Sequence, residues 1–119
     1  ILFISFNILY MDILKNIMEI SADKRNTLFV FLSDELKYKY RYYQLKYIND
    51  LYINDVIHCI RRDTLEFERK GTIKHIDDEI NIQYNKRNYY LDPNEYYFLN
   101  KEVNSVKNMR DFYNSLLNL

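Results

Sequence analysis

The chain has 119 residues, with 17 basic and 17 acidic side chains and therefore no net charge. This length predicts a single domain, and the balanced charge argues against a protein that holds duplex DNA mainly by neutralising phosphates. The single cysteine excludes an internal disulfide and favours a reducing compartment or a packed thiol, and no apolar run approaches the length of a membrane-spanning helix.

The composition also indicates the source. The chain has 13 tyrosines and 7 phenylalanines but one glycine and one proline, and residue types with A/T-rich codons are over-represented. We infer an AT-rich genome, such as that of a large DNA virus, a parasite or an organelle. The first ten residues lack a basic flank, so we expect no signal peptide. Because the chain starts with Ile1 and reaches Met at position 11, we expect an upstream extension, a trimmed start or a non-standard initiator.

The N-terminal third predicts helices. Residues 11–20 predict an amphipathic helix, because apolar side chains recur at helical spacing: Ile13, Leu14, Ile17 and Met18. Residues 21–26 form a polar connector that offers Ser21 and Asn26 as helix caps. The apolar run at 27–32 suits either a strand or a helix.

Residues 33–52 contain two conflicting patterns. Ser33 followed by Asp34 and Glu35 is typical of a helix N-terminus. Downstream, tyrosines alternate with basic residues at a period of two, and tyrosine favours strands. We favour a helix, because about 20 residues without glycine or proline are long for a strand.

The stretch 55–100 predicts short strands separated by turns. We expect the strands at 55–62, 64–76, 79–84, 88–91 and 97–100. Gly71 interrupts the second strand, which suggests a bulge or a sharp bend. The charged residues Glu66 and Glu68 share a face with Lys70, and we expect this face to be solvated. Pro93 predicts a turn, or one short helical turn, before the last strand.

Five strands, the second long and bent, predict an α+β fold with a small five-stranded antiparallel barrel. At fold level, residues 55–100 resemble the Tudor-like and related small β-barrels. The resemblance implies binding of peptides, modified side chains or nucleic acid. We expect one compact domain, in which residues 1–50 form a helical segment on the barrel, 51–100 the barrel, and 101–119 a closing C-terminal helix.

A second resemblance covers about residues 11–45. MDILKNIMEI, SADKRNTLFVFLS and ELKYKYRYY resemble an F-box segment, with an amphipathic helix, a polar link, a hydrophobic second helix and a Lys/Tyr-rich third. The usual Leu-Pro before the first helix is replaced by Leu9 and Tyr10, and the usual Cys-Lys pair is absent. The resemblance implies docking on a Skp-type ubiquitin-ligase adaptor, for which the candidate residues are Ile13, Leu14 and Ile17.

The sequence offers little catalytic chemistry. His58 and Cys59 are neighbours on a predicted strand, so their side chains point to opposite faces and cannot form a nucleophile and base pair. A catalytic pair of Cys59 with His75 from the adjacent strand is geometrically possible, but nothing in the sequence marks a third partner. His75 with Asp77 and Asp78 offers metal ligands, although an Asp pair before a strand favours a hairpin turn. We predict no enzyme, no cofactor, no metal and no small-molecule substrate.

Tyrosines gather around basic residues in the predicted third and fourth strands. The candidate binding surface consists of Tyr84, Lys86, Arg87, Tyr89, Tyr90 and Tyr96. Aromatic residues interleaved with basic ones can stack bases or hold a cation or a peptide. The alternative is that codon bias raises tyrosine everywhere and these rings only pack the core. Tyrosine also suits permanent protein interfaces.

These patterns favour a non-enzymatic structural or protein-interaction subunit of a larger assembly, with a viral particle as the leading example. Its partners are then other protein subunits, inside a cell, in a virus particle or in an organelle. One alternative is a nucleic-acid-binding barrel of the ribosome or the transcription machinery. The other is an F-box-like adaptor.

Overall fold

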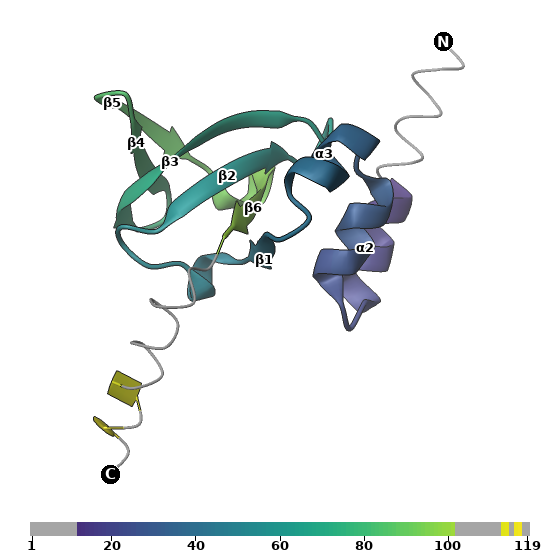
Figure 1. The fold of residues 1–119 in the computed structure, drawn as a ribbon, viewed down its shortest axis with the longest axis horizontal. Coiled ribbons are helices and arrows are strands. Elements are labelled where there is room, and N and C mark those ends of the chain that lie inside the picture. The colour runs from purple at the N-terminus through teal and green to yellow at the C-terminus, as the bar shows by residue number, and fades with distance from the viewer. Residues whose placement is uncertain (1–11, 102–112, 115, 118–119) are drawn as a thin grey trace.

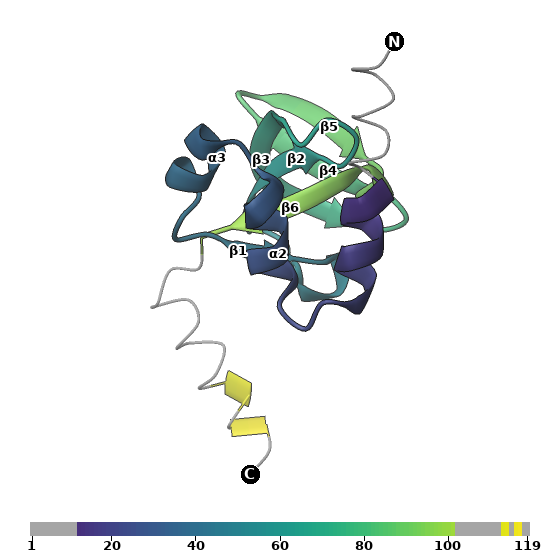
Figure 2. The ribbon, with the colours of Figure 1, turned by 90° about the vertical axis from the view of Figure 1, so that its right-hand side faces the viewer.

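The computed structural model describes residues 12–101, 113–114 and 116–117. An antiparallel sheet forms the centre, and the helix at residues 12–20, α2 (Lys24–Phe31) and α3 (Asp34–Lys39) lie beside one of its faces (Figures 1 and 2). The 3-10 turns are η1 (Ile48–Asp50) and η2 (Pro93–Glu95). The strands are β1 (Gln44–Lys46), β2 (Val56–Arg61), β3 (Phe67–Ile76), β4 (Ile80–Tyr84), β5 (Arg87–Leu91) and β6 (Tyr96–Asn100). No helix among the described residues has the length and apolar character needed to cross a membrane.

The α+β class is confirmed, but the closed five-stranded barrel is wrong. The sheet is open and has six strands in the order β1-β6-β2-β3-β4-β5. The additional strand, β1, lies within the segment for which we favoured a helix, and it pairs with β6 so that Leu45 lies opposite Leu99. This pairing joins residues more than 50 positions apart, so no local pattern reports it.

The N-terminal helices differ from the prediction in their caps. The helix at residues 12–20 is confirmed, and the ambiguous apolar run belongs to helix α2. Asp23 caps α2 in place of Ser21 or Asn26: its carboxylate accepts a hydrogen bond from the Asn26 amide at 3.1 Å. Ser33 caps α3 as predicted, accepting from the amide of Leu36 at 3.3 Å.

The long helix predicted for residues 33–52 is wrong beyond α3. Arg25 of α2 donates to the carbonyl oxygens of Arg41 at 2.6 Å and of Tyr43 at 3.0 Å. A continuing helix would use these carbonyls for its own ladder. Because Arg25 satisfies them instead, the chain can turn after Tyr40 and enter the sheet as β1.

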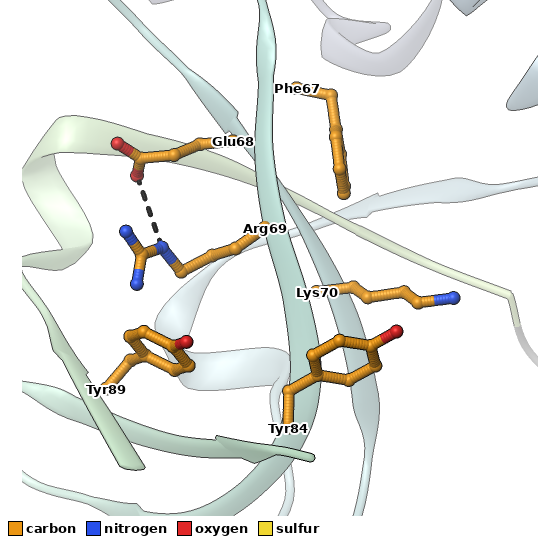
Figure 3. Close-up of a pocket in the computed structure, with 6 residues that line it drawn as sticks. All are labelled: Phe67, Glu68, Arg69, Lys70, Tyr84 and Tyr89. Atoms are coloured by element: carbon orange, nitrogen blue, oxygen red, sulfur yellow. Dashed lines mark ion pairs between the residues drawn. The ribbon is translucent and has the colours of Figure 1, made fainter. Parts of the chain in front are cut away.

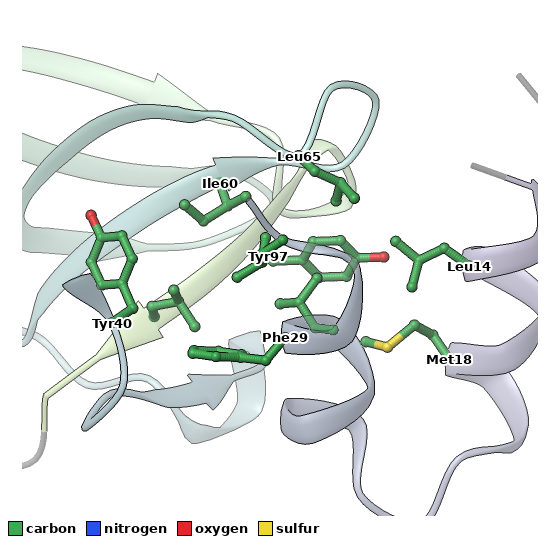
Figure 4. Packing of buried hydrophobic residues seen from close by; sticks show 10 residues of the cluster. Leu14, Met18, Phe29, Tyr40, Ile60, Leu65 and Tyr97 are labelled. Atoms are coloured by element: carbon green, nitrogen blue, oxygen red, sulfur yellow. The ribbon is translucent and has the colours of Figure 1, made fainter. Parts of the chain in front are cut away.

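Two apolar clusters cover the two faces of the sheet. The helix-side core joins the helices to β2 and β6 and contains Leu14, Met18, Leu28, Phe29, Leu32, Tyr40, Ile60, Leu65, Tyr97 and Leu99 (Figure 4). The strand-side core, on the other face, contains Leu51, Ile57, Cys59, Ile73, Ile80, Ile82, Leu91, Tyr96 and Phe98. β2 is therefore covered on both faces, as its apolar pattern requires, and the N-terminal helices supply the cover on one of them. The predicted packing of the C-terminal helix 101–119 lies largely outside the described residues.

Gly71 does not form the predicted bulge. The two register shifts of β3 lie elsewhere, one in its pairing with β2 and one, in its pairing with β4, between Ile73 and His75. A Cβ atom at Gly71 would lie 3.0 Å from the carbonyl oxygen of Gln83 and 3.1 Å from Cδ1 of Ile82. Glycine is therefore needed here because β4 and its side chains approach closely, and not because β3 bends.

The turns agree well with the prediction. β4 and β5 are joined by Asn85 and Lys86, whose φ angles of 51° and 64° are those of a two-residue type I′ turn. Arg87, which we expected in this turn, is the first residue of β5, and β3 starts after the predicted Thr64 because the preceding residues form the turn from β2. The predicted helical turn at the proline is confirmed as η2, capped by the Asp92 carboxylate.

Replacing Gly71 by alanine should lower the free energy of unfolding by about 1–3 kcal/mol, because the added methyl group overpacks the contact with β4. Urea denaturation measures this difference. Lys74→Ala, on an exposed position of the same strand, is the matched control and should change stability little. A Gly71→Ala variant as stable as the control would contradict the close-approach explanation.

Candidate binding groove

A groove of about 360 Å³ lies where β3 meets the β4–β5 hairpin (Figure 3). Its lining residues are Phe67, Glu68, Arg69, Lys70, Tyr84 and Tyr89. Tyr84 pairs with Arg87, and Ile82 pairs with Tyr89. Since alternate residues of a strand share a face, Tyr84 and Tyr89 are brought to the same face of the hairpin.

The two tyrosine rings of the groove each have a cation beside them. The guanidinium carbon of Arg69 lies 4.2 Å from the centre of the Tyr89 ring, and Nζ of Lys70 lies 5.6 Å from the centre of the Tyr84 ring. Both distances fall within the range of cation–π contacts. The groove therefore combines aromatic surface with positive charge of its own.

The one acidic side chain of the groove, Glu68, is held by neighbouring groups. Its carboxylate accepts a short hydrogen bond from the Tyr96 hydroxyl and lies 3.7 Å from Nη1 of Arg61 and 3.6 Å from Nε of Arg69. Burial, together with the bond to Glu68, raises the pKa of Tyr96 to about 12. The negative charge of Glu68 is thus balanced inside the protein. Nε of Arg69 is buried without a hydrogen-bond acceptor among the described residues.

The structure places only some residues of the predicted binding surface at the groove. Tyr84 and Tyr89 line the groove, and Arg87 begins β5 on the same face, opposite Tyr84. Lys86 lies in the exposed turn beside them. Tyr90 is 69% exposed but pairs with Asn81 and so faces the other side of the hairpin.

Tyr96 does not belong to the exposed surface that we predicted. It is buried in the strand-side core, where its ring stacks on Phe98 with centres 6.2 Å apart. The sequence could not show this, because β6 is buried on both faces and has no alternation of polar and apolar residues.

The sequence patterns did not indicate the part of the groove that β3 supplies. We expected Glu68 and Lys70 on one solvated face, but Figure 3 shows Glu68 and Arg69 on one side of β3 and Phe67 and Lys70 on the other. The register shift between β2 and β3 falls in this region, and a bulge of this kind breaks the simple alternation of faces. The pairing of β3 with the tyrosine hairpin was the only information that could have placed Arg69 over Tyr89.

His58 and Cys59 point to opposite faces, as predicted. Cys59 lies in the strand-side core, and burial raises the pKa of its thiol to about 12, which makes it a poor nucleophile. It pairs with Arg69, six residues from His75 along β3, or about 20 Å at the usual rise of a strand. The Cys59–His75 pair that the sequence left open is therefore not formed.

His75 is exposed, and its Nε2 lies 3.8 Å from a carboxylate oxygen of Asp77. Asp77 belongs to the hairpin turn between β3 and β4, as expected. Within the described part of the chain, no group of three His, Cys, Asp or Glu side chains is arranged to hold a metal ion.

The three side chains predicted to dock a partner differ in burial. Leu14 is 1% exposed and belongs to the helix-side core, so it is unavailable to a partner. Ile13 and Ile17 are 43% and 36% exposed, and Ile20 is 86% exposed. The three isoleucines recur at helical spacing and form an apolar stripe on the outer side of this helix.

Comparisons of the chain with protein-family models, with curated proteins and with solved structures gave no match.

His58 should make folding dependent on pH. Its Nδ1 lies 2.9 Å from the Tyr40 hydroxyl in the helix-side part of the protein, and burial, with the charges of Lys70 and Lys39, lowers its pKa to about 4. The unfolded chain, in which histidine has a pKa of about 6.5, binds more protons between these values. The stability that His58 contributes is thus complete above about pH 6.5 and falls as the pH drops towards 4.

Urea denaturation at about pH 7 and pH 5 measures this effect. The free energy of unfolding should fall less for His58→Gln than for the unaltered chain, because glutamine cannot be protonated in this range. His75→Gln, which removes the exposed histidine, should leave the pH dependence nearly unchanged. Equal pH dependence in both variants would contradict the assignment to His58.

Proposed function

We propose that this chain is a protein-interaction subunit of a larger assembly, and that the groove between β3 and the β4–β5 hairpin is its contact surface. The observation that supports this proposal most directly is the combination of exposed aromatic rings with a stacked arginine. Phe67 and Tyr84 are 37% and 42% exposed at the groove, next to Arg69 on Tyr89. Aromatic residues and arginine are the residue types enriched in protein interfaces and in their energetic hot spots.

The arrangement of cations favours a protein over a nucleic acid as the partner. Bases bind single-strand sites by stacking on free aromatic faces. In this groove, Arg69 covers one face of Tyr89 and Lys70 lies beside Tyr84. Zero net charge also gives little long-range attraction for phosphates.

The composition supports a place in a viral particle or another intracellular assembly, because the genome is inferred to be AT-rich and the one thiol is buried. The strand order β6-β2-β3-β4-β5, together with the 3-10 turn η2 directly before β6, supports a distant likeness to Tudor-like folds. The sheet of this protein is open.

Site-specific photo-crosslinking tests the proposed contact surface. The photoreactive residue p-benzoylphenylalanine is placed at Tyr84 in the full chain, which is mixed with an extract of its source and irradiated. We expect a discrete protein adduct, because Tyr84 lines the groove. The matched control carries the same group at Tyr90, an exposed tyrosine on the other face of the same hairpin, and should give none. A nuclease-sensitive adduct, or equal adducts from both positions, would contradict the proposal.

The outward isoleucine stripe favours a second candidate, the F-box-like adaptor. Ile13, Ile17 and Ile20 remain exposed, while the inner side of the same helix is anchored in the core. Three consecutive helices precede the sheet, in the order that the F-box resemblance implies.

A pull-down with a Skp-type adaptor tests this candidate. The unaltered chain should retain the adaptor, and the double variant Ile13→Asp and Ile17→Asp should lose it, since charge would replace the exposed apolar contact. Lys15→Asp, exposed on the same helix about half a turn away from the stripe, is the control and should bind normally. No retention by the unaltered chain would remove this candidate. Leu14 is unsuitable for the test because it is part of the core.

A further inference from the structure

The outer edge of β5 borders the groove and has backbone groups free to pair. β5 stands last in the sheet, and within the described residues it pairs with β4 alone. The type I′ turn makes Tyr84 and Arg87 the first hydrogen-bonded pair of the hairpin. Hydrogen-bonded pairs alternate along an antiparallel ladder, so the N–H and C=O groups of Asn88 and Tyr90 point away from β4. Such an edge can accept another strand.

The charge along this edge is uneven. Lys86 and Arg87 lie at the start of β5, with Arg87 opposite Tyr84 of the groove, and Arg69 and Lys70 line the groove itself. The only acidic residue lining the groove, Glu68, is already balanced by Arg61 and Arg69. The other end of the hairpin is acidic, with Asp77, Asp78 and Glu79 in the turn before β4 and Asp92 after β5.

A cationic ligand fits this groove poorly. The ring of Tyr89 already has Arg69 over it, and Tyr84 has Lys70 beside it, so a bound ammonium or guanidinium group would meet like charges at short range. A carboxylate would instead meet the guanidinium group of Arg69, which lies over Tyr89 on the same face of the hairpin as Arg87. Arginine and carboxylate form strong, charge-assisted contacts.

We propose that the partner presents an extended acidic segment that adds as a further strand to the β5 edge, with its carboxylates on the groove side at the Arg87 end. This inference rests on the proposed function, since it specifies the protein segment that the groove would hold. Successive side chains of an added strand point to opposite faces. Acidic residues at every second position would therefore face Arg69 and Arg87, while the residues between them would lie beside Tyr90 and suit apolar side chains.

Fluorescence anisotropy with labelled peptides tests this proposal on the full chain. The probe is a hexapeptide of alternating Glu and Val between Ser flanks, and the comparison peptides replace Glu by Gln or by Lys. We expect the Glu peptide to bind about tenfold more tightly than the Gln peptide, which corresponds to about 1.4 kcal/mol, and the Lys peptide not to bind. Arg69→Gln and Arg87→Gln should each weaken the Glu peptide, whereas Lys74→Gln, on an exposed position away from the groove, should not.

A proline tests the edge itself. Tyr90→Pro removes an N–H that points away from β4, so it should abolish peptide binding without removing a bond of the β4–β5 ladder. Tyr90→Ala is the matched control, because it loses the ring but keeps the N–H and should still bind. If the proline variant fails to fold, amide hydrogen exchange on the unaltered chain replaces it: the peptide should slow exchange at Asn88 and Tyr90. Unchanged exchange at both amides with bound peptide would overturn strand addition.

The outcomes separate this inference from the proposed function. The acidic-segment proposal would be overturned if the Glu and Lys peptides bound equally, or if none of the three peptides bound. A protein adduct at Tyr84 in the crosslinking experiment would then still support the interaction surface. Binding of a single-stranded oligonucleotide that depends on Arg69 and Arg87, with no binding of the Glu peptide, would overturn both.

Discussion

The pairing of β2 with β6 is the contact on which the rest of the structure depends. It brings together segments about 40 residues apart and places His58 opposite Leu99 and Ile60 opposite Tyr97. Every residue of β6 is buried, so its alternate side chains enter the two cores on opposite faces of the sheet. The N-terminal helices and the β3–β4–β5 part of the sheet are thus assembled on the same pair of strands.

The groove depends on this centre through one polar network. Tyr96 extends from the strand-side core, and its hydroxyl donates to Glu68, whose carboxylate also lies beside Arg61 and Arg69. Glu68 is therefore held from the core side, and the guanidinium group of Arg69 lies over Tyr89 at the edge hairpin. A position set by buried contacts is more constant than one set by exposed side chains alone, which is the property that a recognition surface needs.

Local patterns predicted the parts of this protein that neighbouring residues control. The alternation in residues 80–84, the position of the turn after it and the helical turn at Pro93 were correct, because they need only side-chain periodicity and turn chemistry, although the turn is one residue shorter than predicted. The prediction was wrong where a distant group decided the outcome: Arg25 takes the carbonyls that would have continued α3, and β4 approaches the backbone of Gly71.

The sequence by itself determined the α+β class, most of the strands and the hairpin that carries Tyr84 and Tyr89, since hydrophobic periodicity and turn residues act within a few positions. Only the tertiary structure decided that the sheet stays open, that Tyr96 is buried and that Arg69 joins the tyrosine hairpin. The physical reason is that these features depend on strand register, and a shift of one residue moves a side chain to the other face of the sheet.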